Sequence, residues 1–277
     1  MVDDQDTSRS DPRLSSALNR RIPTSVGTLA IADQGAGTAV VLWPSLFADH
    51  RFYDAVTQQL SVDWRCLRID GPGFGRSQAP QPDTQPERYA DAIIEVLDAL
   101  NIERAVIAGC SWGGQIAAHT GVRSPERTIG VLMMNTPMAP SVGGHRAQVI
   151  GTRLIGSTRF WGRGVARAMF APQFLDAHPE PVRAFVDAFE SFDRKAATTT
   201  VRTTLTRFDG MHDVLPHLRI RTVIMMGELD TQYPVASAMP IAELAPAARI
   251  EVVHGCGHLI PIEAPSRAVA ALHSLRR

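Results

Sequence analysis

The chain has 277 residues, 44% of them hydrophobic, and its basic and acidic residues balance at 28 each. This length and apolar content suit one large domain, or a domain that carries an insertion. Because the net charge is zero, neither a nucleic acid nor an anionic membrane is expected as the main partner.

The N-terminal segment and the cysteines indicate the compartment. Residues 1–20 are polar and lack the apolar stretch of a secretory signal, which predicts a flexible tail. No segment approaches the roughly 20 apolar residues that cross a bilayer. The three cysteines, Cys66, Cys110 and Cys256, form no CxxC pair, which favours reduced, buried thiols in a cytoplasmic protein.

Strands and helices alternate along most of the chain. Residues 20–43 alternate in polarity and break at Gly27 and at residues 34–38, which predicts an antiparallel start. Wholly apolar strands separated by helices then predict a parallel sheet with helices on both faces. The expected strands are 39–43, 64–70, 104–110, 128–136, 221–227 and 248–255, and the expected helices are 49–60, 86–101, 112–124, 235–245 and 266–275.

A region without such strands interrupts this alternation. Residues 138–217 contain amphipathic helices, for example over 158–170 and 179–195. Six of the ten phenylalanines fall there, namely Phe160, Phe170, Phe174, Phe185, Phe189 and Phe192. These side chains either pack the region onto the sheet domain or line an apolar substrate pocket. We therefore predict a helical insertion over 138–217 in a core domain made of residues 21–137 and 218–277.

The motif GCSWG at residues 109–113 is an instance of G-x-S-x-G between a predicted strand and a predicted helix. A serine at such a tight turn adopts strained dihedral angles, and glycine neighbours avoid collisions with the adjoining elements. Gly109, Gly113 and Gly114 meet that need. The turn lifts the Ser111 hydroxyl above the carboxyl edge of the sheet, at the N-terminus of a helix. The motif therefore predicts a nucleophilic serine.

A serine nucleophile needs a base, and the base needs a third group that orients it. Asp230 follows the predicted strand 221–227, and His258 follows the predicted strand 248–255. This order of serine, acid and histidine along the chain is the one that accompanies such a serine turn. We expect Asp230 to be the orienting acid and His258 the base.

Other interpretations of these residues stay open from the sequence. Asp230 would also suit a helix cap before residues 235–245, with Glu228 as the alternative acid, and His258 would suit a packed surface position. His254 and His258 have the spacing of metal ligands on a helix, but the glycines beside them disfavour a helix and no carboxylate cluster completes a site. We therefore expect no metal ion.

An oxyanion site needs backbone N–H donors. One is expected at Trp112, the residue after the nucleophile, and the other in the loop after strand 39–43. Pro44 in that loop has no N–H. The second donor is therefore expected at Ser45, with Leu46 as the alternative.

Together these motifs resemble the α/β-hydrolase superfamily. The resemblance covers roughly residues 20–277 and includes WPSLFADHRFY, DGPGFGRS, GCSWGG, GELDTQYP and GCGHLIPIEAP. It implies an α/β fold with a mostly parallel eight-stranded sheet, helices on both faces and a helical lid after strand 128–136. It also implies the triad roles for Ser111, Asp230 and His258. Many members have His-Gly where this chain has Trp-Pro, and the PSLF loop is somewhat similar to the oxyanion loop of enol-lactone hydrolases.

The expected reaction is hydrolysis of a carboxylic ester or lactone through an acyl-enzyme on Ser111, without a cofactor. A serine at this position disfavours epoxide hydrolysis and dehalogenation, for which similar proteins use an aspartate. Two alternatives share the fold: a C–C bond hydrolase, lyase or perhydrolase, and a non-catalytic ligand receptor. Trp112 and the phenylalanines of 138–217 favour a small, mainly apolar substrate, although the basic residues of 145–153 would suit a carboxylate. The oligomeric state is not predicted.

Overall fold

The computed structural model describes residues 18–60, 63–140 and 145–276. Its strands form one eight-stranded sheet in the order β1-β2-β4-β3-β5-β6-β7-β8. Strand β2 runs antiparallel to β1 and β4, and the other neighbours are parallel. The strands are β1 (Arg20–Ile22), β2 (Leu29–Gly35), β3 (Thr38–Trp43), β4 (Trp64–Ile69), β5 (Ala105–Cys110), β6 (Thr128–Met134), β7 (Thr222–Gly227) and β8 (Ala248–Val253).

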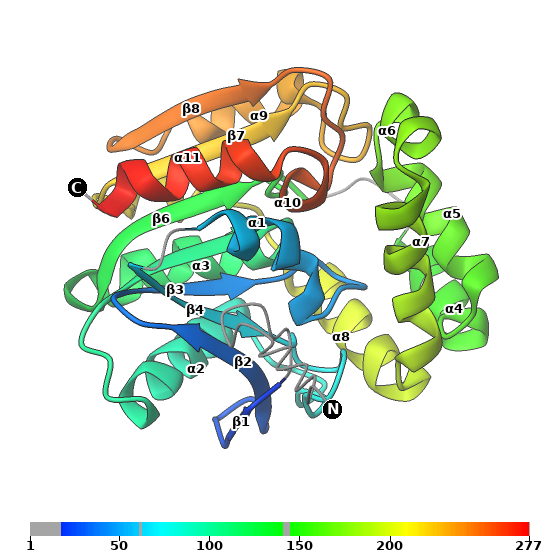
Figure 1. Cartoon of the computed structure of the whole chain (residues 1–277), viewed down its shortest axis with the longest axis horizontal. Coiled ribbons are helices and arrows are strands. Elements are labelled where there is room, and N and C mark those ends of the chain that lie inside the picture. The colour runs from blue at the N-terminus through cyan, green and yellow to red at the C-terminus, as the bar shows by residue number, and fades with distance from the viewer. Residues whose placement is uncertain (1–17, 61–62, 141–144, 277) are drawn as a thin grey trace, which may run out of the picture.

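Helices cover both faces of this sheet. Figure 1 shows α1 and α11 in front of the sheet and α3 and α9 behind it. The central strand β5 is buried along its whole length, which explains its uninterrupted apolar sequence. The helical segments of this part of the chain are η2 (His50–Tyr53), α1 (Asp54–Gln59), α2 (Pro86–Ala99), α3 (Trp112–Arg123), η3 (Pro125–Arg127), η5 (Leu215–His217), α9 (Val235–Ala242), α10 (Ile260–Glu263) and α11 (Pro265–Arg276).

The predicted fold class is confirmed: the sheet is mostly parallel, has eight strands and begins antiparallel. The predicted buried thiols are also confirmed, because Cys66, Cys110 and Cys256 are free and buried. The predicted tail falls mainly on residues 1–17, which lie outside the described residues. Within the described ranges, no helix combines the length and apolarity that crossing a membrane requires.

Between β6 and β7 the described residues form five α-helices that we call the helical insertion, residues 145–207. These helices lie beside one end of the sheet, with α4 and α5 farthest from it in Figure 1. They are α4 (His145–Ile155), α5 (Arg159–Met169), α6 (Pro172–Ala177), α7 (Pro179–Ala188) and α8 (Arg194–Arg207), with the short η4 (Phe189–Ser191) before α8. The division into a core domain and an inserted domain stays a prediction.

The expected single helix over 179–195 is wrong. Helix α7 ends at Ala188, and Phe192 has extended dihedral angles. The Asp193 side chain then accepts a hydrogen bond from the N–H of Ala196 at 2.8 Å and starts α8. An aspartate at this position stabilises a new helix start better than a continuing helix.

Aromatic side chains pack the helical insertion against the sheet domain. Phe189 stacks on Phe47 of the core, with ring centroids 5.6 Å apart, and Phe192 meets Phe74 edge-on at 5.2 Å. The packing interpretation is therefore confirmed for Phe189 and Phe192. Phe160 fits neither interpretation, because it is 72% exposed.

Candidate active site

Ser111 lies at the sharp turn between β5 and α3. Its φ of 54° and ψ of −118° fall outside the regions that a serine ordinarily occupies. The Ser111 N–H donates to the carbonyl of Met134 on the adjacent strand at 2.8 Å, which fixes the turn to the sheet. Such strain persists only where the surroundings enforce it, and it is concentrated at functional sites.

The glycines beside the turn are required by close backbone contacts. A Cβ atom on Gly109 would lie 2.0 Å from the carbonyl carbon of Gly113, and a Cβ atom on Gly113 would lie 2.3 Å from the carbonyl oxygen of Trp43. A Cβ atom on Gly114 would collide with Thr136. The predicted reason for these three glycines is thus confirmed.

The structure brings Asp230 and His258 together. The Oδ2 atom of Asp230 lies 2.7 Å from Nδ1 of His258, and the exposure of both side chains is 1% or less. The other carboxylate oxygen of Asp230 accepts the N–H groups of Gln232 and Tyr233. The helix-cap interpretation of Asp230 is wrong, because the cap residue of α9 is Pro234.

The alternative acid, Glu228, lies elsewhere. Its carboxylate is 3.2 Å from Nδ1 of His254 and accepts the N–H of Gly255. These hydrogen bonds, with the backbone one the stronger, hold the pKa of Glu228 below its usual range. The side chain of His254 is largely exposed. His254 and His258 therefore pair with two different carboxylates and do not converge on one ligand.

Two further residues position the histidine loop, and neither was expected there from the sequence. Asn135 donates from Nδ2 to the carbonyl of Gly257 at 2.7 Å, and its Oδ1 accepts the N–H of Gly227. Glu263 accepts the N–H groups of Gly257 and Leu259, one on each side of His258. Asn135 could have been noticed in the sequence, because it is a polar residue directly after the apolar segment that forms β6.

The helical insertion also contacts this loop. The N–H of His258 donates to the carbonyl of Met169 at the end of α5, and Glu263 accepts the N–H of Ala171 at 2.9 Å. Burial raises the pKa of the Glu263 carboxyl, although these backbone donors oppose that effect. The position of His258 therefore depends on both parts of the chain.

A small cavity is lined by Ser111 and by Tyr233, the residue whose ring neighbours His258. Tyr233 lines this cavity, and its ring centroid lies 5.5 Å from that of His258. Cys110, directly before Ser111, has its Sγ atom 3.5 Å from the carbonyl oxygen of His258. The cavity is lined by Leu46, Ser111, Trp112, Gln115, Pro137 and Tyr233 of the sheet domain and by Thr204, Leu205 and Phe208 at the end of α8.

The cysteines near the site are buried thiols whose ionisation is disfavoured. Burial raises the pKa of the Cys110 and Cys256 thiols far above their ordinary value, and the negative charge of Asp230 acts in the same direction. The thiolate is the reactive form of cysteine. Ser111 therefore stays the predicted nucleophile at this turn.

The model of the alpha/beta hydrolase family matches residues 40–272. The chain belongs to this family. A similar protein is the 2-hydroxymuconate semialdehyde hydrolase of Pseudomonas sp. (strain CF600), which is 26% identical over 84% of this chain and 81% of its own. A thermophilic esterase from Thermogutta terrifontis has a similar structure, with a TM-score of 0.84 and 22% identity over 94% of this chain and 100% of that one.

The enol-lactonase from Burkholderia xenovorans LB400 is similar too, with a TM-score of 0.83 and 20% identity over 92% of this chain and 99% of that one. These relatives are named for different substrates. The comparisons therefore establish an α/β hydrolase and its fold, and they leave the substrate open.

In this α/β hydrolase the loop after β3 passes close to the serine turn. Ser45 is fully buried, and its hydroxyl has no hydrogen-bond partner among the described residues. Leu46 lines the Ser111 cavity, and the next residue, Phe47, has a positive φ of 63°. A bulky residue in that conformation is unusual, so the loop is held in shape by its neighbours.

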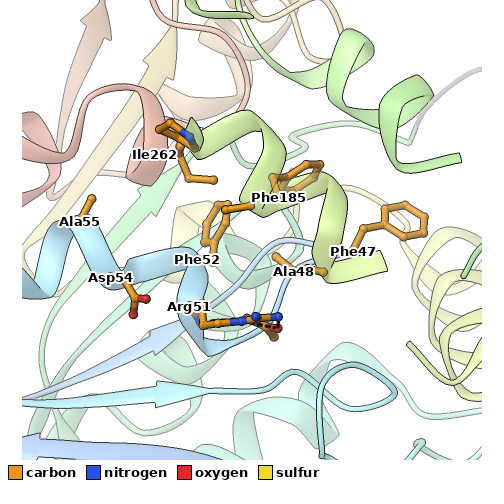
Figure 2. Close-up of a pocket in the computed structure, with 12 residues that line it drawn as sticks. Phe47, Ala48, Arg51, Phe52, Asp54, Ala55, Phe185 and Ile262 are labelled. Atoms are coloured by element: carbon orange, nitrogen blue, oxygen red, sulfur yellow. Dashed lines mark hydrogen bonds and ion pairs between the residues drawn. The ribbon is translucent and has the colours of Figure 1, made fainter. Parts of the chain in front are cut away.

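A larger, mainly apolar cavity lies between this loop, helix α1 and helix α7 (Figure 2). It has a volume of about 750 Å³, including space open to solvent. Phe52 and Phe185 contribute aromatic walls, and Arg51 and Asp54 contribute charge. Phe185 lines this cavity but Ser111 does not, so the prediction that phenylalanines of the insertion line a substrate pocket stays a prediction.

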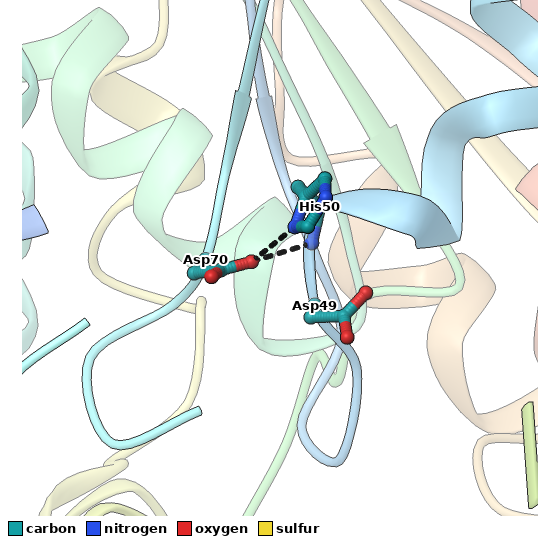
Figure 3. Close-up of side chains that lie close together, drawn as sticks. All are labelled: Asp49, His50 and Asp70. Carbon is teal, nitrogen blue, oxygen red and sulfur yellow. Dashed lines mark hydrogen bonds and ion pairs between the residues drawn. The ribbon is translucent and has the colours of Figure 1, made fainter. Parts of the chain in front are cut away.

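Asp49, His50 and Asp70 come together as a cluster that resembles a metal site (Figure 3). Their acceptor atoms already have donors. One Asp70 oxygen lies 2.8 Å from the N–H and 2.7 Å from Nδ1 of His50, and the other accepts the N–H of Arg76. The Asp49 carboxylate is held by Arg51. These contacts join the loops after β3 and β4, so we assign the cluster to loop positioning.

Proposed function

We propose that this chain is a serine hydrolase that cleaves a carboxylic ester or lactone through an acyl-enzyme on Ser111. One observation carries the proposal. A serine in strained backbone geometry stands at the same sheet edge as a buried Asp–His pair joined at 2.7 Å. That combination provides a nucleophile, a base and a group that orients the base.

In the first step His258 takes the hydroxyl proton while the Ser111 oxygen forms a bond to the substrate carbonyl carbon. Asp230 holds the imidazole in the tautomer with its proton on Nδ1 and stabilises the imidazolium that forms. The tetrahedral intermediate then collapses. His258 gives its proton to the leaving alcohol, and the acyl group stays on Ser111.

In the second step a water molecule attacks the acyl-enzyme. His258 removes a proton from that water as its oxygen bonds to the acyl carbon, and then returns the proton to the Ser111 oxygen. The acid product leaves and the free enzyme is restored. For a lactone, the acid and the alcohol are parts of one product.

We place the first oxyanion donor at the N–H of Trp112. Trp112 begins α3, so its N–H has no partner within the helix. For the second donor the choice lies between Ser45 and Leu46. Of these two, Leu46 lines the cavity that contains Ser111, which supports Leu46. Together the two donors would stabilise the developing negative charge by several kcal/mol, at roughly 3–4 kcal/mol for each donor.

The cavity lining supports a mainly apolar substrate. Leu46, Leu205 and Phe208 face it, and Gln115 and Thr204 add few polar groups. A site of this kind fixes a substrate by shape and by a small number of hydrogen bonds. We therefore propose a small, apolar acyl or lactone ring.

A C–C bond hydrolase is the second candidate. The observation in its favour is the 26% identity with a 2-hydroxymuconate semialdehyde hydrolase. Such a reaction would use the same serine, acid and histidine on a different carbonyl substrate. A non-catalytic receptor is disfavoured, because a ligand receptor has no need of a buried Asp–His pair beside a strained serine.

A substrate panel separates these candidates. The purified full chain is offered p-nitrophenyl esters of increasing acyl length, lactones and vinylogous diketones, with Ser111→Ala as the control. We expect ester or lactone turnover that Ser111→Ala lowers by orders of magnitude. Turnover of diketones alone would assign the C–C reaction, and ester turnover that is unchanged in Ser111→Ala would contradict the mechanism.

A further inference from the structure

The outer face of the helical insertion combines exposed hydrophobic and basic side chains. In the described part of the chain, every large hydrophobic side chain that is exposed lies on α4 or α5. Ile150 is 55% exposed, Leu154 is 63% exposed and Phe160 is 72% exposed. Isolated exposed apolar residues are common on protein surfaces, but a local group of them marks a contact surface.

The charge of this segment differs from that of the whole chain. Between residues 145 and 175 the sequence has five arginines and no acidic residue, although the chain as a whole has no net charge. The expectation of no membrane partner rested on that overall balance. Local charge, however, decides what a surface attracts within a Debye length.

The hydrophobic and basic residues share one side of the two helices. On α4 the residues Arg146, Ile150, Arg153 and Leu154 have the spacing of one helix face, and all are exposed. On α5 the exposed residues Phe160, Arg163 and Arg167 are also spaced three or four positions apart, as on one helix face. We call these seven residues the basic-apolar face.

The two helices that carry these residues lie next to each other. A Cβ atom on Gly151 of α4 would lie 2.2 Å from the ring of Trp161 on α5, so the helices are in direct contact. The inner sides of the helices are already occupied, since α4 packs on α8 and α5 packs on α7. The basic-apolar face is therefore exposed on this pair of helices, which lie farthest from the sheet in Figure 1.

We propose that the basic-apolar face docks onto an anionic phospholipid surface. Amphipathic helices that carry arginine around aliphatic and aromatic side chains bind in the plane of a bilayer, with the apolar residues among the acyl chains. Arginine is attracted to anionic headgroups and adds to the affinity. A second copy of this chain is a poorer occupant, because two faces of the same positive charge repel each other.

A nucleic acid is also a poorer occupant. Nucleic acids would pair with the arginines and could stack one base on Phe160, but Ile150 and Leu154 offer no aromatic surface for further bases. This inference does not depend on the proposed function, because docking is measured without any ester. The two proposals therefore fail separately.

The test is cosedimentation of the full chain with phosphatidylcholine vesicles, with and without phosphatidylglycerol. The Ser111→Ala variant serves alongside the unaltered chain, so that lipid hydrolysis cannot affect the result. We expect binding that requires phosphatidylglycerol and weakens as salt is raised. The variant Ile150→Ser/Leu154→Ser/Phe160→Ser should lose most of this binding.

Charge is tested with Arg153→Gln/Arg163→Gln. We expect a loss in affinity of about fivefold for each arginine, from the usual attraction of one positive charge to an anionic bilayer. The matched control, Arg104→Gln/Arg219→Gln, removes two exposed arginines outside the helical insertion and should bind as the unaltered chain does. Circular dichroism and thermal unfolding establish that each variant is folded.

Any of four results would overturn the proposal. The first two are no binding to phosphatidylglycerol vesicles, and binding that both insertion variants leave unchanged. The others are an equal loss of binding in the Arg104/Arg219 control, and a dimer in light scattering that the triple serine variant dissociates. The last result would assign the face to a second copy of the chain. Binding of a single-stranded RNA, lost in the same variants while vesicles are ignored, would assign it to nucleic acid.

Discussion

At the carboxyl edge of the sheet, the side chains of Asp230 and His258 are almost completely buried, whereas Leu154 and Phe160 on the helical insertion are mostly exposed. The Asp230 carboxylate is held by His258 and by the N–H groups of Gln232 and Tyr233. The contrast fits the two proposals, in which the sheet edge carries the chemistry and the outer side of the insertion meets a lipid surface.

The largest expected effect is at the buried acid. Asp230→Asn should lower kcat by about 10⁴-fold, because an amide cannot hold His258 in the required tautomer or stabilise its charged form. Steady-state kinetics on the best ester of the panel measures this effect. Glu228→Gln, two residues away, is the matched control and should change kcat by less than about tenfold. Equal losses in both variants would contradict the assignment of the acid.

The second expected effect compares two glycines for stability. Gly113→Ala should lower the free energy of unfolding by about 3 kcal/mol, since its Cβ atom would lie 2.3 Å from the Trp43 carbonyl oxygen. Gly164→Ala on α5 should raise that free energy by about 1 kcal/mol, because no heavy atom lies within 4 Å of the added carbon. Urea denaturation measures both. A small loss at Gly113 would mean that the turn is less tightly packed than described.

The third expected effect is on specificity. Leu205→Ala enlarges the Ser111 cavity from the side of the insertion and should shift the ratio of kcat/KM between long and short acyl esters by about tenfold toward the long ones. The chemical step itself should be retained. Leu175→Ala, a partly buried leucine of the insertion outside this cavity, is the control. An unchanged ratio in Leu205→Ala would argue that the cavity does not hold the acyl group.

The smallest expected effect is a pH dependence of stability. Burial lowers the pKa of His119 on α3 from 6.5, although Glu87 opposes this effect. As the pH falls through 6.5, the imidazole of the unfolded chain therefore takes up a proton more readily than that of the folded chain. The free energy of unfolding falls as a result when the solution is acidified. The effect is expected to be small, because Glu87 acts against the effect of burial. His119→Gln should flatten the decline in urea titrations between pH 7 and pH 5, with the exposed His212→Gln as control.

Much of the sheet edge could be predicted from the sequence. Ser111, Asp230 and His258 each follow a predicted apolar strand. Because parallel strands end at the same edge of the sheet, the sequence indicated that these residues lie at one edge. The structure confirms that Asp230, rather than Glu228, pairs with His258. Asn135 and Glu263 could not be assigned in the same way. Asn135, for example, bonds to a residue 122 positions away, and no local pattern specifies that partner.

The helical insertion could be predicted only in outline. Its amphipathic pattern indicated helices but not which neighbour covers each face, and so Phe160 was expected to be packed or to line a pocket. The break between α7 and α8 depends on a single capping interaction of Asp193. Helical periodicity reveals the spacing of apolar residues, but it does not reveal a side-chain hydrogen bond to the backbone that starts a new helix.

Labelling with a fluorophosphonate tests the central claim most directly, because the probe reacts with a serine that a neighbouring base has activated. Intact-mass and peptide analysis of the unaltered chain should show one adduct, on Ser111, and Ser111→Ala should show none. His258→Ala should react far more slowly. A folded chain that stays unlabelled, or that is labelled equally well at another residue, would contradict the account of Ser111 as the nucleophile.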